Sequence, residues 1–533
     1  MPEKTGWDIR PPDIIKFLEN IRLGTYDEDS LEATTTFTML RNAKRGETEI
    51  AELVAAIGAD EWGVGKLIAF PLERLILFET VAALATEVQM KEDDLSSLVQ
   101  DMYRHHMTPK KPVIKQMEDL ILKEAKWKSL KIIGEIDGAT KDVSRKKEII
   151  SKGGAEADAL NTFEIIKNRL ISGVYKPDET IYDLAGKKIY DPSTAVTAAN
   201  VDDIALALTE KIVNDKFYMQ IARDTAKKYV DDKLKSVVDK GLVKYPGSNE
   251  PLRRLSIHTG EERRTFMLAG APACGKGTIV AAMEMQAKEQ FDLDWDDTVK
   301  INTDNYREIV STAPGLGDDI TVHSDLNTFE ASFISDLANK RVQEQLNRNQ
   351  GHHLVIDGVY PSANRLRMGT QNGGSLHIAC VSVPVDVSVG RAFKRGQEIG
   401  RFVGSEYLIS AHKAVSKDIL KNIVTTCKDT NAELSVFNTN VPRGEQPIQA
   451  MQLNLSTKKA IIYDADAMAE IYGKKNIDPK ALDSDHLYPP GVQELDYSYL
   501  SELESLGITV EFEDPEMQLK VEEIIRPASS MSM

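Results

Sequence analysis

The spacing of apolar residues divides the chain into a helical part and a part in which strands and helices alternate. From residue 12 to about residue 104, apolar residues recur at the three- and four-residue intervals of helices. A second mostly helical region covers about residues 158–241, after a polar Gly- and Lys-rich segment at 134–154. With prolines at 109 and 112 as a boundary, we expect a largely α-helical N-terminal region made of residues 1–112 and 113–245.

After Arg264 the pattern changes to short apolar runs separated by helical segments. We expect strands at 265–270, 298–303, 353–356, 377–383, 434–438 and 460–463. Helices are expected to about residue 289 and at 329–347, 386–399 and 407–425. Strands joined through helices predict right-handed crossovers and a parallel sheet. We therefore expect an α/β domain at residues 251–478, followed by an acidic, poorly periodic extension at 479–533 that ends in a disordered tail.

Composition narrows the classes of function. The 533 residues carry a net charge of −17, which argues against a general nucleic-acid binder. The three cysteines are far apart and have neither metal-ligand nor redox spacing, so we expect reduced thiols. No apolar core follows the polar N-terminus, and the apolar stretch 67–85 contains charges and a proline, which predicts an amphipathic helix. We expect a cytoplasmic protein without a membrane span; export that needs no N-terminal signal stays open.

A glycine-rich loop follows the first strand of the α/β domain and precedes its first helix. This is the context that a phosphate-binding P-loop requires. Backbone N–H groups of such a loop, the helix N-terminus and a lysine surround nucleotide phosphates. The nucleotide-binding residues that we expect are Gly270, Ala271, Pro272, Ala273, Cys274, Gly275, Lys276, Gly277 and Thr278. Because Gly277 stands directly after the lysine, as in adenylate kinases, Thr278 is a phosphate contact and only a weak candidate ligand for magnesium.

Two carboxylates end predicted strands. Asp304 follows the second strand, where a hydroxyl acceptor must give up its proton during phosphoryl transfer, so we assign it as the catalytic base. The alternative is that Asp304 caps the helix at 305–310. Asp357 ends the third strand and is expected to hold magnesium or substrate, with ordinary capping of the strand end as its alternative.

Arginines follow the fourth strand. Arg391 and Arg395 are four residues apart on the expected helix at 386–399, and Arg401 comes just after it. Transfer of a phosphoryl group needs cations near its equatorial oxygens, which suits a lid carrying these side chains. A solvated basic helix face is the alternative, and for Arg391 taken alone it is the favoured one.

Taken together, these motifs resemble the zeta-toxin kinases over about residues 265–466. The resemblance rests on the P-loop, the run Ile-Asn-Thr-Asp304-Asn-Tyr-Arg307, the run Thr-Phe-Glu330, and the strand ending in Asp357-Gly. Val383-Pro with Arg395 and Arg401 completes it. The chain departs from the family pattern after the P-loop lysine, at Asp357 where Glu is usual, and at Val359 where a hydroxyl residue is usual.

The resemblance implies an α/β P-loop NTPase domain that transfers phosphate from ATP, with Mg²⁺, to a hydroxyl of a UDP-N-acetyl sugar. By motif, Lys276 binds ATP phosphates, Asp304 is the base, and Glu330 contacts the sugar. Arg307 and Asp357 join the substrate site, and Arg395 and Arg401 stabilise the transferring charge. The departures bear on the acceptor more than on the chemistry.

Two other functions stay open. The domain could phosphorylate a different acceptor, such as a protein, a nucleic-acid end or another metabolite, of which the acidic balance disfavours nucleic acid. Alternatively, the chain could be a regulatory protein that binds nucleotide without transferring phosphate. The helical N-terminal half carries no chemical motif, and we expect it to bind a protein partner, to serve as a targeting surface or to alter the substrate.

Overall fold

A computed structural model describes residues 7, 71–90, 94–177, 180–312, 328–359, 363–399, 403–417, 419–442 and 444–525. The chain forms two compact units. The first contains residues 1–37, 81–102 and 237–533, and the second contains residues 38–80 and 103–236. Each unit is described by itself. The finer division expected at residues 112, 245 and 478 stays a prediction.

An eight-stranded sheet forms the centre of the first unit, in the order β12-β11-β10-β9-β8-β5-β7-β6. The five strands from β9 to β6 run parallel, in the α/β arrangement that the sequence predicts. They are β5 (Arg264–Ala269), β6 (Thr298–Asn302), β7 (His353–Gly358), β8 (Ser375–Ser382) and β9 (Ala432–Asn438).

The other three strands extend the sheet at one edge. They are β10 (Ile448–Asn454), β11 (Lys459–Ile462) and β12 (Thr509–Phe512). β10 is antiparallel to both β9 and β11, and β12 is parallel to β11. The predicted parallel sheet is therefore extended at this edge by antiparallel pairing through β10, and neither β10 nor β12 was predicted. The segment after residue 478 contributes β12 to the sheet.

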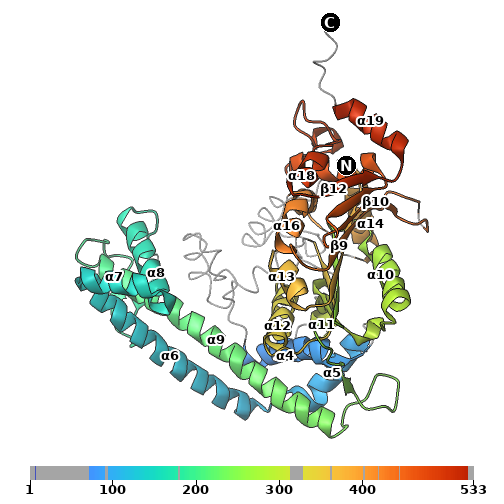
Figure 1. Ribbon diagram of the computed structural model, residues 1–533. Coiled ribbons are helices and arrows are strands. Elements are labelled where there is room, and N and C mark those ends of the chain that lie inside the picture. The colour runs from blue at the N-terminus through green and yellow to red at the C-terminus, as the bar shows by residue number, and fades with distance from the viewer. Residues whose placement is uncertain are drawn as a thin grey trace. The chain divides into compact units, whose positions relative to one another are not determined.

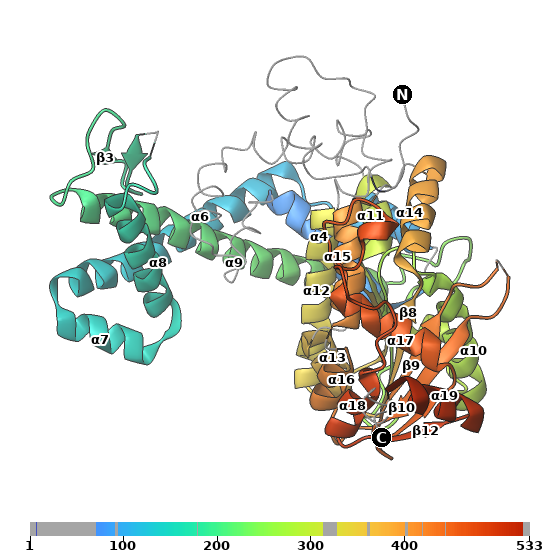
Figure 2. The same ribbon diagram turned by 90° about the horizontal axis from the view of Figure 1, so that it is seen from above.

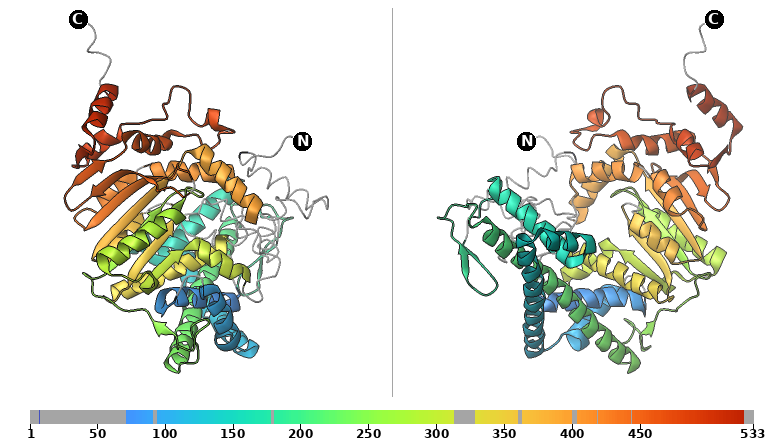
Figure 3. Two further views of the ribbon diagram at one scale, coloured as in Figure 1. Left: turned by 90° about the vertical axis from the view of Figure 1, so that its right-hand side faces the viewer. Right: turned by 60° about the vertical axis from the view of Figure 1, so that its left-hand side comes forward.

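Helices cover both faces of the sheet (Figure 1). On one face α10 (Lys276–Phe291) packs on Phe266, Leu268 and Val381. On the other face lie α12 (Thr328–Asn347), α13 (Ala363–Gln371), α16 (Ile419–Thr426) and α17 (Ala465–Gly473), which share a core with Met267. Alternate strand residues point to opposite faces, so a separate apolar core lies on each face of the sheet. The turned views in Figure 3 show the helices on either side of the sheet.

The remaining helices of the first unit lie around this frame. α11 (Thr303–Thr312) follows β6 directly and packs against α12 and against α5 (Leu95–Met102). α14 (Val385–Ile399) and α15 (Ser405–Ser416) follow β8. α18 (Tyr499–Ser505) and α19 (Pro515–Ile525) flank β12. The single helix expected at 407–425 is in fact two helices, α15 and α16.

The second unit is built from helices and one short hairpin (Figure 2). Its helices α6 (Lys111–Lys141), α8 (Gly154–Ile171) and α9 (Val201–Asp239) share a core that includes Ile136, Phe163 and Ile204. α7 (Val143–Lys152) joins α6 to α8, and β2 (Ile181–Tyr182) pairs with β3 (Lys188–Tyr190).

The polar, Gly- and Lys-rich segment 134–154, for which no structure was predicted, is mostly helical, because burial of Ile132, Ile136 and Ala139 outweighs the cost of about 1 kcal/mol for each glycine inside α6. The helix expected from residue 67 begins at Leu72 in α4 (Leu72–Glu87), directly after a proline, and residues 67–70 lie outside the described part. Among the described helices, none is long and apolar enough to cross a membrane.

Candidate functional site

The loop between β5 and α10 has the conformation that close approach to phosphates requires. Gly275 has a φ of 88° and Ala273 a φ of 59°, both in the left-handed region. At Gly270 a Cβ atom would lie 2.6 Å from the Cys274 Sγ and 2.6 Å from the Val381 carbonyl oxygen, so only glycine fits. α10 begins at Lys276, which places the positive end of its dipole at the loop. The loop is thus a ready anion-binding turn.

Residues from two neighbouring strand ends hold this loop in place. Thr439 follows β9, and its Oγ1 donates a hydrogen bond of 2.5 Å to the Cys274 carbonyl. Its backbone N–H donates to the Ser382 carbonyl at the end of β8 over 2.9 Å. Ser388 of α14 donates through its Oγ to the Pro272 carbonyl over 2.8 Å. Neither Thr439 nor Ser388 was predicted, because neither belongs to the loop motif.

Arg391 takes part in this support. Its Nη2 donates to the Thr439 carbonyl over 3.1 Å. The favoured sequence interpretation, a solvated face residue, is therefore wrong for Arg391, since its guanidinium braces the residue that holds Cys274. Arg395, on the same helix, is exposed, and its part in catalysis stays a prediction. Arg401 lies outside the described residues.

Lys276 lies along the loop that precedes it. Its Nζ donates to the Gly270 carbonyl over 2.8 Å and approaches the Ala271 carbonyl at 3.5 Å. The ammonium group is therefore held at the mouth of the loop.

The two carboxylates end strands that are neighbours in the sheet. In the order β5-β7-β6, Asp357 of β7 stands beside Leu268 of β5 and beside Asn302 of β6. Asn302 donates through Nδ2 to Asp357 Oδ2 over 3.2 Å. Because strands are spaced by about 4.8 Å, the P-loop and the start of α11 leave the same edge of the sheet about 10 Å apart.

Asp304 lies in the first turn of α11 rather than at its cap. Asn302 caps that turn, because its Oδ1 accepts a hydrogen bond of 2.9 Å from the Asp304 backbone N–H. The alternative that Asp304 serves as the N-cap is therefore excluded. Its carboxylate is 46% exposed and forms an ion pair with Arg307, with 3.4 Å between Nη1 and Oδ1.

One further cation at this edge was not predicted. Arg365 of α13 lies over Gly358, where a Cβ atom would come within 1.8 Å of the guanidinium Nη1. Burial lowers the pKa of Arg365, and the charges of Asp336 and Asp357 oppose that shift. No spacing rule connects residue 365 to the strand that ends at Asp357, so sequence reasoning had no signal for it. Glu330 lies half-buried in the first turn of α12, the helix that packs against α11.

A buried ion pair lies behind the ends of β8 and β9. Lys474 is 1% exposed, and its Nζ lies 3.0 Å from Glu470 Oε1. The same Nζ donates to Ser382 Oγ and to the Val383 carbonyl, both over 2.8 Å. Burial lowers the pKa of Lys474, while Glu470 raises it. Glu470 also accepts from Asn438 Nδ2 over 3.0 Å, so α17 is tied to the strand ends that support the loop.

Comparison with known proteins agrees with the resemblance. Residues 250–442 match the family model described as Zeta toxin. The chain contains a zeta-toxin domain. The motifs placed the start of the resemblance at about residue 265, and the match begins 15 residues earlier, at residue 250. It ends before β10. No curated protein matches the sequence.

Some solved structures match part of the chain at low similarity. The AvrRxo1-ORF1:AvrRxo1-ORF2 complex with ATP is 15% identical, over 49% of this chain and 75% of that chain, with a TM-score of 0.32. The native form of that complex is 14% identical, over 49% and 74% of the two chains, also at 0.32. A structure from the PezAT toxin–antitoxin system of Streptococcus pneumoniae is 14% identical, over 36% and 71%, at 0.25.

The zeta-toxin domain offers few protein ligands for a metal ion. Among the described residues, no group of three or more His, Cys, Asp or Glu side chains could hold one. Asp357, already bonded to Asn302, is a single carboxylate beside the P-loop. This arrangement fits Mg²⁺, which proteins bind through one or two carboxylates together with substrate phosphates and water.

Proposed function

We propose that the zeta-toxin domain is an ATP-dependent phosphotransferase that moves the γ-phosphate to a hydroxyl group. The observation that carries the proposal is the meeting of three strand ends at one edge of the sheet. β5 delivers the P-loop, β7 delivers Asp357, and β6 delivers α11 with Asp304. Open α/β sheets bind ligands outside the carboxyl ends of their strands, which is where these groups lie.

Each group has a distinct role in the proposed reaction. The P-loop N–H groups and Lys276 bind the ATP phosphates, and Thr278 contacts them from the first turn of α10. Asp304 accepts the proton of the acceptor hydroxyl as the phosphoryl group transfers. Mg²⁺, held by Asp357 and the phosphates, would neutralise charge on the β and γ oxygens. Arg365, near Asp357, adds a positive charge at the same edge.

The acceptor that we propose is a UDP-N-acetyl sugar. Glu330 and Arg307 are the proposed sugar contacts, and Arg395 and Arg401 the proposed cations over the transferring group. The packing of α11 on α12 supports the first part, since it brings together the helices that carry Asp304 and Glu330. Arg307 is 20% exposed and paired with Asp304, so a substrate hydroxyl that reaches Asp304 also meets Arg307.

A panel of acceptors tests this function. The protein is incubated with ATP and Mg²⁺ and, in separate reactions, with UDP-N-acetyl sugars, other nucleotide sugars and candidate proteins. Mass spectrometry then reports which acceptor gains one phosphate. A phosphate gain on another class of acceptor would support the kinase activity and exclude the UDP-N-acetyl sugar as the acceptor. ATP binding without transfer to any acceptor would support a regulatory role instead.

For the helical unit we propose a protein partner. On α6, Leu120 and Trp127 are seven residues apart, therefore on one face, and are 68% and 63% exposed. Large exposed apolar side chains in a row are typical of interaction surfaces. Replacing Trp127 with Glu and measuring the mass in solution by light scattering tests whether this face joins copies of the chain; an unchanged mass leaves a different partner.

A further inference from the structure

A cavity of about 450 Å³ lies at the amino ends of β5, β8 and β9. The P-loop follows the opposite, carboxyl end of β5. β8 is eight residues long, so its two ends are about 25 Å apart. The cavity is on the face that α10 covers, and Gln290 and Phe291 at the end of that helix form one wall. Its size matches that of small-molecule sites. It is therefore separate from the nucleotide site.

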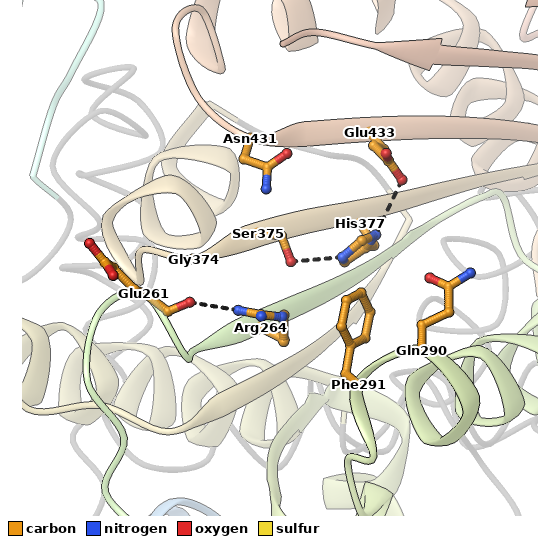
Figure 4. A pocket seen from close by; sticks show the side chains of 9 residues that line it. All are labelled: Glu261, Arg264, Gln290, Phe291, Gly374, Ser375, His377, Asn431 and Glu433. Carbon is orange, nitrogen blue, oxygen red and sulfur yellow. Dashed lines mark hydrogen bonds and ion pairs between the residues drawn. The ribbon is translucent and has the colours of Figure 1, made fainter.

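Three side chains in this cavity lie in a row, the first two joined by a hydrogen bond and the last two by an ion-pair contact (Figure 4). Ser375 Oγ lies 2.8 Å from His377 Nε2. On the other side of the ring, His377 Nδ1 lies 3.5 Å from Glu433 Oε2. Ser375 and His377 are two residues apart on β8 and thus on one face of the sheet, and Glu433 is directly opposite His377 on β9.

The protonation of this chain follows from its partners. The contact with His377 lowers the pKa of Glu433, which places a carboxylate 3.5 Å from Nδ1 of the ring. In the tautomer that carries its proton on Nδ1, Nε2 has the lone pair and accepts from the Ser375 hydroxyl. A hydroxyl that donates to an imidazole, which is in turn oriented by a carboxylate, is the signature of an activated nucleophile.

The ring is also held in position by packing. It stacks on Phe266 with 5.3 Å between ring centroids and 21° between planes, and it contacts Phe291 at 5.2 Å. Asn454 donates to the second oxygen of Glu433 over 2.9 Å, which fixes the carboxylate. The serine, the ring and the carboxylate are therefore preorganised rather than brought together by chance rotamers.

We propose that this cavity is a second active site, in which Ser375 is the nucleophile that cleaves a small carboxylic ester. Ser375 Oγ forms a bond to the ester carbonyl carbon as its proton moves to His377 Nε2. The bond from that carbon to the alcohol oxygen breaks, and the alcohol leaves with this proton. Water, deprotonated by the same nitrogen, then releases the carboxylic acid and restores the serine.

The walls of the cavity set the class of substrate. Glu261 and Arg264 bring one charge of each sign, and Gln290 and Asn431 bring neutral amides. The Arg264 guanidinium lies over the Phe291 ring, 4.9 Å from its centre, so this wall of the cavity is part cationic and part aromatic. A small uncharged ester fits these walls better than a strongly anionic one.

A fluorophosphonate probe tests the proposal in the full-length protein. It transfers its phosphonyl group to an activated serine and releases fluoride, and mapping of the labelled peptide identifies the residue. We expect one label at Ser375, none in Ser375→Ala, and labelling that is slower by about 10²- to 10⁴-fold in His377→Gln. Ser435→Ala changes a serine farther along the same face of β9 and is the matched control with unchanged labelling.

Two further variants separate position from chemistry. In Glu433→Gln the acid limb of the labelling rate should move to lower pH, because a carboxylate stabilises the neighbouring imidazolium and an amide does not. Glu284→Gln, an exposed change on α10 outside the cavity lining, should be labelled like the wild type. An unlabelled wild-type protein, or a label on any other residue, would overturn the proposal and leave the three side chains a structural link between β8 and β9.

Discussion

The buried ion pair of Lys474 and Glu470 makes the sharpest prediction for stability. Lys474→Met keeps the apolar stem and removes an ammonium that has three oxygen partners, each within 3.0 Å. Glu470, whose side chain is 14% exposed, then loses its cationic partner and keeps the hydrogen bond from Asn438. Because removal of one partner strands a buried charge, we expect the free energy of unfolding to fall by about 3–5 kcal/mol.

The neighbouring lysine is a matched control. Lys475 forms an ion pair of 2.9 Å with Asp496, but the two side chains are 25% and 20% exposed. Lys475→Met should therefore cost about 1 kcal/mol or less. Adding Glu470→Gln to Lys474→Met removes the stranded charge and should recover part of the loss.

Urea unfolding followed by fluorescence measures these differences. Since the chain has two units, the transition of the nucleotide-binding unit is identified as the one that ATP shifts to higher urea. A stranded charge at Glu470 is refuted if the free energy of unfolding of Lys474→Met lies within about 1 kcal/mol of the wild type. It is also refuted if Lys474→Met and Lys475→Met lower that free energy equally. Either result would mean that water or a local rearrangement replaces the interactions that Glu470 loses with the Lys474 ammonium.

The remaining predictions concern the site and its pH dependence. Asp304→Asn should lower phosphoryl transfer by about 10²- to 10⁴-fold and leave the Kd for ATP unchanged, measured against the exposed control Asp292→Asn; transfer near the wild-type rate would exclude Asp304 as the base. Thr439→Val should raise the Kd for ATP about tenfold, the equivalent of one lost hydrogen bond of about 1.4 kcal/mol, and Thr439→Ser should restore it; equal Kd values in calorimetry would contradict a role in holding the loop. Burial lowers the pKa of His353 to about 4, and its Nδ1 accepts from the Arg264 N–H over 3.0 Å. The unfolded chain binds the extra proton first, so stability should fall as the pH drops from about 6.5 towards 4, and less steeply in His353→Gln; parallel urea midpoints across that range would contradict this.

Local rules predicted the parts of the site that follow directly from a strand. The P-loop and Asp304 each follow an apolar run, so periodicity and motif placed the P-loop directly after β5 and Asp304 directly after β6. Sheet order was beyond those rules. The position of Asp357 between the other two strand ends depends on β7 pairing with both β5 and β6, which are farther apart in the chain than any periodicity extends.

Supporting contacts were harder to predict, because they join segments that are distant in sequence. Thr439 contacts Cys274 across 165 positions, and the Lys474 side chain contacts Ser382 across 92. Nothing in the composition around Lys474 separates it from Lys475, although one is buried and the other half-exposed. Similarly, Arg391 and Arg395 share a helix face by spacing. Arg391 contacts Thr439 because the chain after β9 passes next to it, which no local pattern predicts.

The zeta-toxin match stops at residue 442, yet three further strands continue the sheet. A shortened protein that ended there would leave β9, a seven-residue strand, with a bare row of amide and carbonyl groups along one side. Such an edge pairs readily with another chain, so the fragment would be prone to aggregate even though it contains the whole P-loop. Expression of an isolated catalytic fragment therefore has to extend past Phe512, so that β12 closes the row beside β11.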